Sequence, residues 1–245
     1  MESLSTIAVI LIIAIPGIMA ITFHEAAHGF VAKKLGDDTA FRAGRVTFNP
    51  LKHIDLVGTI ILPAIVLWAS RGAFLFGYAK PVPVDFSRLD NPRRDMILVA
   101  AAGPGINILL ALISSVLLHL VDLFVGDTAS TLRVALGFSV FINALFAVFN
   151  LLPLPPLDGG RILVGLLPHG LASRLARIEP FGIFLLIAII LLVPTVAAQF
   201  GVRFNIFSSV IIPAMTAVTD LLGVLTGAEV TEATRRALGA LQGTL

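Results

Sequence analysis

The sequence predicts an all-α polytopic membrane protein, because it is strongly apolar and its apolar residues form runs long enough to cross a bilayer. Of the 245 residues, 57% are hydrophobic and 13% are charged, and the mean hydropathy is +0.99. Soluble domains carry about 25% charged residues. A transmembrane helix needs about 20 mainly apolar residues. Runs of this kind lie at about 4–35, 95–124, 132–152, 180–198 and 205–226.

These runs leave no room for a sizeable soluble module, so we expect one membrane-embedded domain over 1–245. Its core would cover about 4–168, with additional helices over about 176–226 and a short polar C-terminal tail. The first run has no basic residues before it and continues straight into His24, so we expect a retained helix and not a signal peptide. Basic residues are not interleaved with aromatics, which argues against nucleic-acid binding. Without cysteine, any zinc must be held by histidine and carboxylate.

The region between the first two long runs is irregular. Residues 36–56 are polar and broken by glycine and proline, and Val57–Ser70 is apolar but short and interrupted by Pro63. The stretch Phe74–Val84 is typical of an extended edge strand limited by its prolines. We therefore expect about five to six transmembrane helices with a small β-like or re-entrant element between the first two.

The charge distribution predicts the orientation in the membrane. Ten of the 17 Lys and Arg residues lie between Lys33 and Arg94, whereas the loop 121–131 has two aspartates and no basic residue. By the positive-inside rule, 33–94 is cytoplasmic, 121–131 is on the other side and the N-terminus is outside. This parity requires that 57–76 enter and leave by the same face, as a re-entrant hairpin does. A sixth span is the alternative.

The first run ends in the motif H-E-x-x-H, formed by His24, Glu25 and His28. Residues four apart share a helix face, so the two histidines can present ring nitrogens to one metal. Glu25 is close enough to reach a metal-bound water without being a ligand. Ionisable side chains at membrane depth are costly and usually functional, so packing explains this cluster poorly.

A second candidate segment is the proline-rich break 150–161, which contains Asp158. Irregular backbone at membrane depth is tolerated only where it is buried in protein or lines a cavity. Prolines 153, 155 and 156 end the preceding helix, and the glycines after Asp158 allow its backbone to approach another element closely. Asp158 therefore suits a third zinc ligand, and a helix N-cap is the alternative for this residue alone.

Together these motifs resemble the site-2 protease family of intramembrane zinc metalloproteases. The similarity is carried by the H-E-x-x-H motif and by 150–160, with Gly103-Pro104-x-x-Asn107 between them resembling the family's G-P-x-x-N helix. Residues 44–55 and 77–84 resemble the compact subgroup that lacks PDZ and nucleotide-sensing domains. The resemblance covers about residues 20–165.

The resemblance implies one zinc per chain, bound by His24, His28 and Asp158. It implies that Glu25 is the general base and that Asn150 stabilises the oxyanion or positions the substrate. It also implies a prokaryotic plasma-membrane protein that cleaves membrane proteins or peptides within the lipid bilayer, with its active site towards the cytoplasmic side. The oligomeric state is not predicted.

Further residues have weaker assignments. A substrate helix must unwind to expose a peptide bond, and the strand-like segment with Phe76, Gly77 and Tyr78 could hold it extended. His53 and Asp55 could support the metal ligands, or could form an ordinary loop pair.

Two other functions are compatible with the sequence. Intramembrane histidine and carboxylates also mark metal- or proton-coupled transporters, although the two halves show no convincing internal repeat. A catalytically silent relative that binds membrane partners is the other, although it would have no physical need for all four polar residues of the site.

Overall fold

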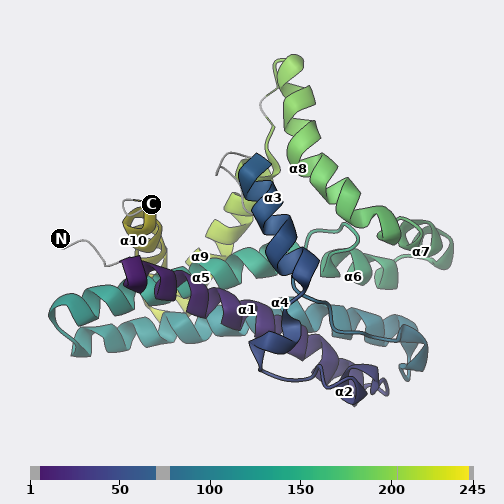
Figure 1. Cartoon of the computed structure of the whole chain (residues 1–245), viewed down its shortest axis with the longest axis horizontal. Coiled ribbons are helices and arrows are strands. Elements are labelled where there is room, and N and C mark those ends of the chain that lie inside the picture. The colour runs from purple at the N-terminus through teal and green to yellow at the C-terminus, as the bar shows by residue number, and fades with distance from the viewer. Residues whose placement is uncertain (1–5, 70–77, 203, 243–245) are drawn as a thin grey trace.

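The computed structural model describes residues 6–69, 78–202 and 204–242. Its central layer consists of three long helices, α1 (Thr6–Lys34), α4 (Pro92–Leu117) and α5 (Gly126–Asn150), which lie side by side (Figure 1). The chain reverses direction between α4 and α5, where a 3₁₀ turn over Leu118–Leu123 extends α4. The first three predicted spans are therefore confirmed as helices.

Local sequence accounts for the ends of these helices. Helix α1 ends at Lys33 and Lys34, whose positive charge suits the carbonyl end of a helix, and Gly36 follows with a φ of 104°. Helix α4 begins with Pro92, which needs no hydrogen-bond acceptor at the first position of a helix. Helix α5 ends at Asn150, just before the proline-rich break.

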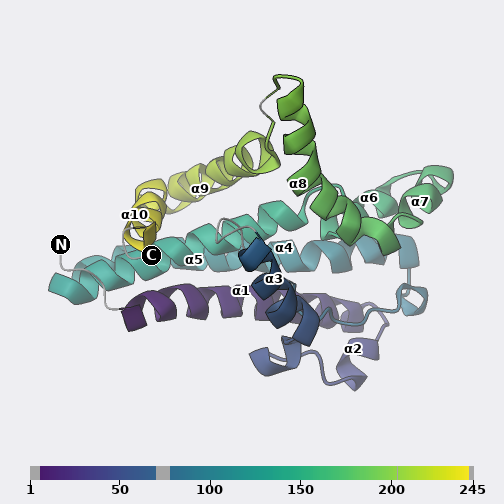
Figure 2. The ribbon, with the colours of Figure 1, turned by 45° about the horizontal axis from the view of Figure 1, so that its top comes forward.

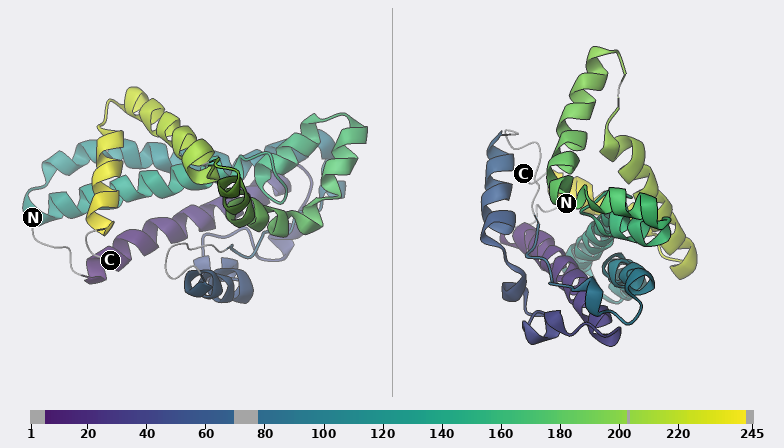
Figure 3. Two further views of the ribbon diagram at one scale, coloured as in Figure 1. Left: turned by 90° about the horizontal axis from the view of Figure 1, so that it is seen from above. Right: turned by 90° about the vertical axis from the view of Figure 1, so that its right-hand side faces the viewer.

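Among the described residues, four helices are long and apolar enough to cross a membrane. They cover Ile7–Lys34, Pro92–Leu123, Gly126–Asn150 and Phe207–Thr226, and the bent pair His169–Ile190 and Leu192–Gln199 makes a fifth if it counts as one span. The bent pair contains α7 (His169–Ala176) and α8 (Gly182–Gln199), and the span Phe207–Thr226 contains α9 (Ile212–Thr226). The short helix α6 (Asp158–Leu166) precedes α7. Helix α8 projects from the central layer (Figures 2 and 3). Helix α9 leads back towards the end of the layer at which α1 begins.

Where the structure describes it, the irregular region after α1 contains only short elements. A short helix α2 (Thr39–Arg42) is followed by a 3₁₀ turn (Pro50–His53), a π-helical turn (Leu56–Ile61) and α3 (Leu62–Ala69). The π-helical turn and α3 are each shorter than a full membrane span, in keeping with a re-entrant element. Residues 78–84 form no strand, since Pro81 and Pro83 cannot donate to a ladder, and residues 74–77 of the expected strand lie outside the described part.

The C-terminal segment differs from the expected polar tail, because Val230–Gln242 forms helix α10. Its residues Val230, Ala233 and Ala237 recur at helical spacing. They are buried against α5 and the C-terminal part of α4. Gly137 of α5 permits this contact, since a Cβ there would lie well under 3.0 Å from the Ala233 carbonyl oxygen. Helix α10 therefore closes the end of the layer opposite to α2 (Figure 1).

Candidate metal centre

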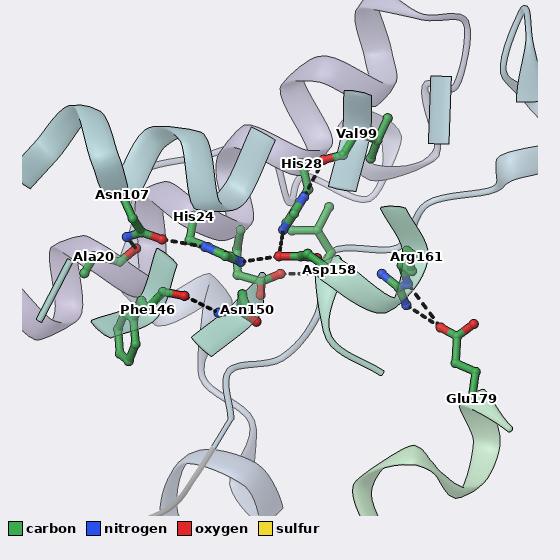
Figure 4. Close-up of polar contacts among 12 residues, drawn as sticks. Ala20, His24, His28, Val99, Asn107, Phe146, Asn150, Asp158, Arg161 and Glu179 are labelled. Atoms are coloured by element: carbon green, nitrogen blue, oxygen red, sulfur yellow. Dashed lines mark hydrogen bonds and ion pairs between the residues drawn. The ribbon is translucent and has the colours of Figure 1, made fainter. Parts of the chain in front are cut away.

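Three buried side chains converge from two elements far apart in sequence. His24 and His28 lie on one face of α1, and Asp158 is the first residue of α6. Asp158 Oδ2 lies 3.1 Å from His24 Nε2 and 3.4 Å from His28 Nε2 (Figure 4). Two ligands of a tetrahedral zinc, each about 2.0–2.1 Å from the metal, lie roughly 3.3–3.4 Å apart. The spacing of the three side chains therefore fits one zinc ion.

The hydrogen bonds of the two histidines leave the correct nitrogens free for a metal. His28 Nδ1 donates to the Val99 carbonyl oxygen at 2.7 Å, and His24 Nδ1 donates to Asn107 Oδ1 at 2.6 Å (Figure 4). With hydrogens on both Nδ1 atoms, each Nε2 presents a lone pair towards Asp158. Within the described residues, Asp158 Oδ2 is buried and accepts no hydrogen bond. A metal cation between these three electron-pair donors would satisfy all of them at once.

Gly103 of α4 leaves room beside these donors. A Cβ on this residue would lie 2.6 Å from His24 Nε2 and closer still to His28 Nε2. The missing side chain thus creates the space next to both ring nitrogens in which a metal would lie. Two histidines and one carboxylate form a known catalytic zinc set that keeps a fourth position open for water. The residues present therefore fit zinc.

Glycines also explain how Asp158 reaches the histidines. A Cβ on Gly159 would collide with the Leu151 carbonyl group, and one on Gly160 would collide with the backbone of Pro155. This confirms that the glycines after Asp158 allow a close backbone approach. The N-cap alternative for Asp158 does not hold, since Leu157 occupies the N-cap position of α6 and no side chain caps that helix end.

Two arginines connect α6 to neighbouring segments, Arg93 at its C-terminal end and Arg161 in its first turn. Arg93, at the start of α4, donates to the carbonyl oxygens of Gly165, Leu166 and Leu167, where a cation is favourable for the helix dipole. Arg161, one turn after Asp158, forms an ion pair of 2.8 Å with Glu179 ahead of α8 (Figure 4). The position of the Asp158 carboxylate is thus tied to α4 and to the segment that precedes α8.

Glu25 and Asn150 are not among the three converging donors. Glu25 is half-buried, and its Oε2 accepts a hydrogen bond of 2.8 Å from the Val82 backbone N–H. Asn150 lies at the end of α5, where its Nδ2 donates to the Phe146 carbonyl oxygen at 3.0 Å (Figure 4). That bond uses one of its two amide hydrogens.

His53 and Asp55 serve the irregular segment and not the three ligands. His53 is buried and bonds through Nε2 to the Thr47 carbonyl oxygen, and Asp55 accepts hydrogen bonds from Val57 and Gly58 at the start of the π-helical turn. The main chain of this segment in turn holds the extended residues 78–82. Tyr78 is exposed, and Phe76 and Gly77 lie outside the described residues.

Sequence reasoning missed several residues that surround the centre. It placed Gly103 and Asn107 in a helix that resembles the family's but gave neither a role at the site, although both lie beside the histidines. Their four-residue spacing, which equals that of His24 and His28, was a usable signal because it places both on one face of α4. Nothing in the local sequence pointed to Val82 or Arg93, since their contacts join segments distant along the chain.

The fold and the site define a class, a multi-pass membrane protein with two histidines and one carboxylate that could hold a metal ion. Comparison with known proteins gives the same assignment. The profile of Peptidase family M50 matches residues 119–193. YwhC of Bacillus subtilis (strain 168), provisionally named a zinc metalloprotease, is 40% identical over 181 residues, which are 72% of this chain and 78% of that protein.

Mycobacterial relatives named Rip2, also provisionally as zinc metalloproteases, are similar as well. The protein from Mycolicibacterium smegmatis is 28% identical, over 80% of this chain and 73% of its own length. The protein from Mycobacterium tuberculosis (strain H37Rv) is 30% identical, over 78% and 70% respectively. No solved structure matches. The chain belongs to Peptidase family M50, the site-2 proteases, and is a zinc metallopeptidase of the membrane.

Proposed function

We propose that this protein is an intramembrane endopeptidase that hydrolyses peptide bonds in the transmembrane segments of other proteins or peptides. The observation that carries the proposal is the burial of His24, His28 and Asp158 inside the layer of long helices. His28 lies five residues before Lys33, and His24 nine, which places the site about 8–14 Å along α1 from its basic end. By the positive-inside rule that end is cytoplasmic, so cleavage would occur within the bilayer near its cytoplasmic face.

The proposed chemistry assigns one task to each polar residue. His24, His28 and Asp158 would hold zinc, which when bound polarises a peptide carbonyl and makes water nucleophilic at neutral pH. Glu25 would take the proton from the attacking water and deliver it to the nitrogen of the leaving amine. The hydrogen bond from Val82 N–H holds one carboxylate oxygen of Glu25 in place and leaves the other for this transfer.

Asn150 would act on the oxygen of the scissile carbonyl. Its second amide hydrogen, which the contact with Phe146 does not use, can donate to the negative charge that develops there. A preorganised donor of this kind is worth about 2–4 kcal/mol in the transition state.

The extended segment 78–83 offers an edge on which a substrate could be held. The backbone groups of alternate residues are used within the protein, since the N–H groups of Tyr78, Lys80 and Val82 all donate. Their acceptors are Gly58 O, His53 O and Glu25 Oε2, respectively. Successive residues of an extended chain direct their backbone groups to opposite sides, so Ala79, Pro81 and Pro83 face away from these partners.

An unwound substrate segment could therefore pair with Ala79 N–H and with the carbonyl oxygens of Ala79 and Pro81. Such pairing holds a peptide extended with its peptide bonds accessible. It would also place the peptide near Glu25, because Val82, which follows Pro81, donates its N–H to Glu25. Replacing Ala79 with proline removes the N–H group on this edge. The variant should bind zinc like the parent but cleave more slowly, and an unchanged cleavage rate would rule out this edge.

The proposal is tested with the purified parent and its Glu25→Gln variant in detergent. Zinc content and cleavage of a panel of transmembrane model substrates are measured for both. Equal zinc with cleavage by the parent alone supports a metallopeptidase with Glu25 as its base. Cleavage by both proteins would refute the role of Glu25. A parent without zinc under metal-replete conditions would refute the metal centre.

The orientation of the site can be tested separately. Because the chain has no cysteine, single cysteines at Ser87 and Ser130 can be labelled selectively. Both positions are exposed, one on the basic side and the other in α5 beside the acidic loop. A membrane-impermeant maleimide added to intact cells should label Ser130→Cys and not Ser87→Cys, and the reverse pattern would place the site at the outer face.

A further inference from the structure

A buried side-chain amide of α4 contacts His24 on the side that faces away from Asp158. The side chain of Asn107 is fully buried and makes three hydrogen bonds. Its Oδ1 accepts from His24 Nδ1 at 2.6 Å, and its Nδ2 donates to the Ala20 carbonyl oxygen at 3.1 Å and to Asn143 Oδ1 at 2.9 Å. Figure 4 shows Asn107 on the side of His24 opposite to Asp158. Asn107 therefore joins α1, α4 and α5 at one point.

The direction of this amide follows from its partners. The Ala20 carbonyl oxygen can only accept a hydrogen bond, so it must face Nδ2 of Asn107 and not Oδ1. Asn143 is oriented in the same way, because its Nδ2 donates to the Ser139 carbonyl oxygen at 2.9 Å and its Oδ1 is then turned towards Asn107. Two backbone carbonyls thus fix both side-chain amides, and Oδ1 of Asn107 is presented to His24.

The two histidines differ in how their tautomer is set. His28 Nδ1 bonds to the Val99 carbonyl oxygen, which is backbone and accepts whatever the side chain at that position. His24 Nδ1 bonds to the Asn107 side chain. Only while Oδ1 faces the ring does the hydrogen stay on Nδ1, and only then does Nε2 direct a lone pair towards Asp158. The metal-binding form of His24 therefore depends on a single side chain.

We infer that Asn107, oriented by the Ala20 carbonyl oxygen, is a positioning residue that selects the tautomer of His24 whose Nε2 binds zinc. This inference rests on the proposed role of His24 as a metal ligand. It differs from a packing role, in which a buried amide pair only joins α4 to α5. The two roles make different predictions, because the amide pair can be broken from either side.

The matched variants are Asn107→Leu and Asn143→Leu. Both remove the hydrogen bond between the two side-chain amides, but only the first leaves His24 Nδ1 without its acceptor. Loss of a partner that orients a metal-bound histidine typically weakens metal binding by about 10–100-fold. We expect a loss of this size for Asn107→Leu and a loss below this range for Asn143→Leu. Zinc affinity is measured by competition with a chelator, and the melting temperature reports packing.

The conservative variant Asn107→Asp adds a second comparison. A carboxylate still accepts from His24 Nδ1, although it can no longer donate to Ala20 or Asn143. Zinc affinity should therefore recover most of what Asn107→Leu loses, even if the melting temperature does not. Nitrogen-15 spectra of the metal-free parent, labelled at its histidines, should show His24 with its hydrogen on Nδ1. This last measurement needs no variant to fold.

The outcomes separate this inference from the proposed function. Equal zinc affinity of the parent and Asn107→Leu would overturn the inference, as would a metal-free parent with the His24 hydrogen on Nε2. Equal losses in the two leucine variants would also overturn it, because that result is expected from packing alone. Failure of His24→Ala to weaken zinc binding would instead overturn the metal centre itself.

Discussion

Replacing Gly103 with alanine should remove zinc from this protein without unfolding it. The added methyl carbon would lie 2.6 Å from His24 Nε2 and closer still to His28 Nε2. A zinc ion must lie about 2.0–2.1 Å from the same two atoms. The methyl group and the metal would therefore compete for one space, and the metal is the partner that can leave.

The size of the effect follows from these distances. To bring the methyl contact to His24 Nε2 up to 3.0 Å, the ring would have to retreat by about 0.4 Å, and His28 would have to move further. A zinc site tolerates deviations of only about 0.2 Å in its metal–ligand distances. Removing a supporting partner alone typically costs 10–100-fold in affinity, so a direct clash should cost at least ~100-fold, or about 2.8 kcal/mol.

The assay compares zinc content and chelator competition for the parent, Gly103→Ala and Gly105→Ala. Gly105 lies in the same helix, and a Cβ there would meet no atom within 4 Å, so it receives the same methyl group in open space. Gly105→Ala should bind zinc like the parent. Parent-like zinc affinity in Gly103→Ala, with intact helicity, would refute the argument that this glycine makes room for the metal.

Two further predictions concern residues around the site. Val82→Pro removes the N–H that holds Glu25, so zinc content should be unchanged while the cleavage rate falls by about tenfold. This factor corresponds to the loss of one charge-assisted hydrogen bond of about 1.5 kcal/mol. An unchanged cleavage rate would show that Glu25 needs no such support. For Asp37, burial raises the pKa of the carboxyl group, but hydrogen bonds from Thr39 and from Asp85 N–H outweigh burial and lower it. Its ionised form therefore stabilises the fold above about pH 4, and this contribution is lost as the pH falls through the lowered pKa. Asp37→Asn should lower the melting temperature at pH 7 and flatten its decline between pH 5 and about pH 3, and a parallel decline in both proteins would contradict the assignment.

The sequence by itself determined the membrane class, the position of the long helices and the three candidate ligands. Apolar runs of this length have no stable alternative to helices in a bilayer, because every backbone group must be satisfied within the segment. The spacing of His24 and His28 places them on a shared helix face. Asp158 was identifiable because a carboxylate at membrane depth is costly, and the prolines and glycines around it predict a buried, irregular segment that can bring it to a metal.

The tertiary structure decided what surrounds those ligands. Gly103 and Asn107 gain their roles only because α4 packs its face against α1 at His24, a contact between segments about 80 residues apart. The sequence predicts a polar tail in place of helix α10 because the apolar face of this helix is narrow and built largely of alanine. Only its packing against α5 shows that this face is buried. Local sequence determines which residues can bind a metal, whereas the packing of distant helices determines which neighbours make room for it and orient its ligands.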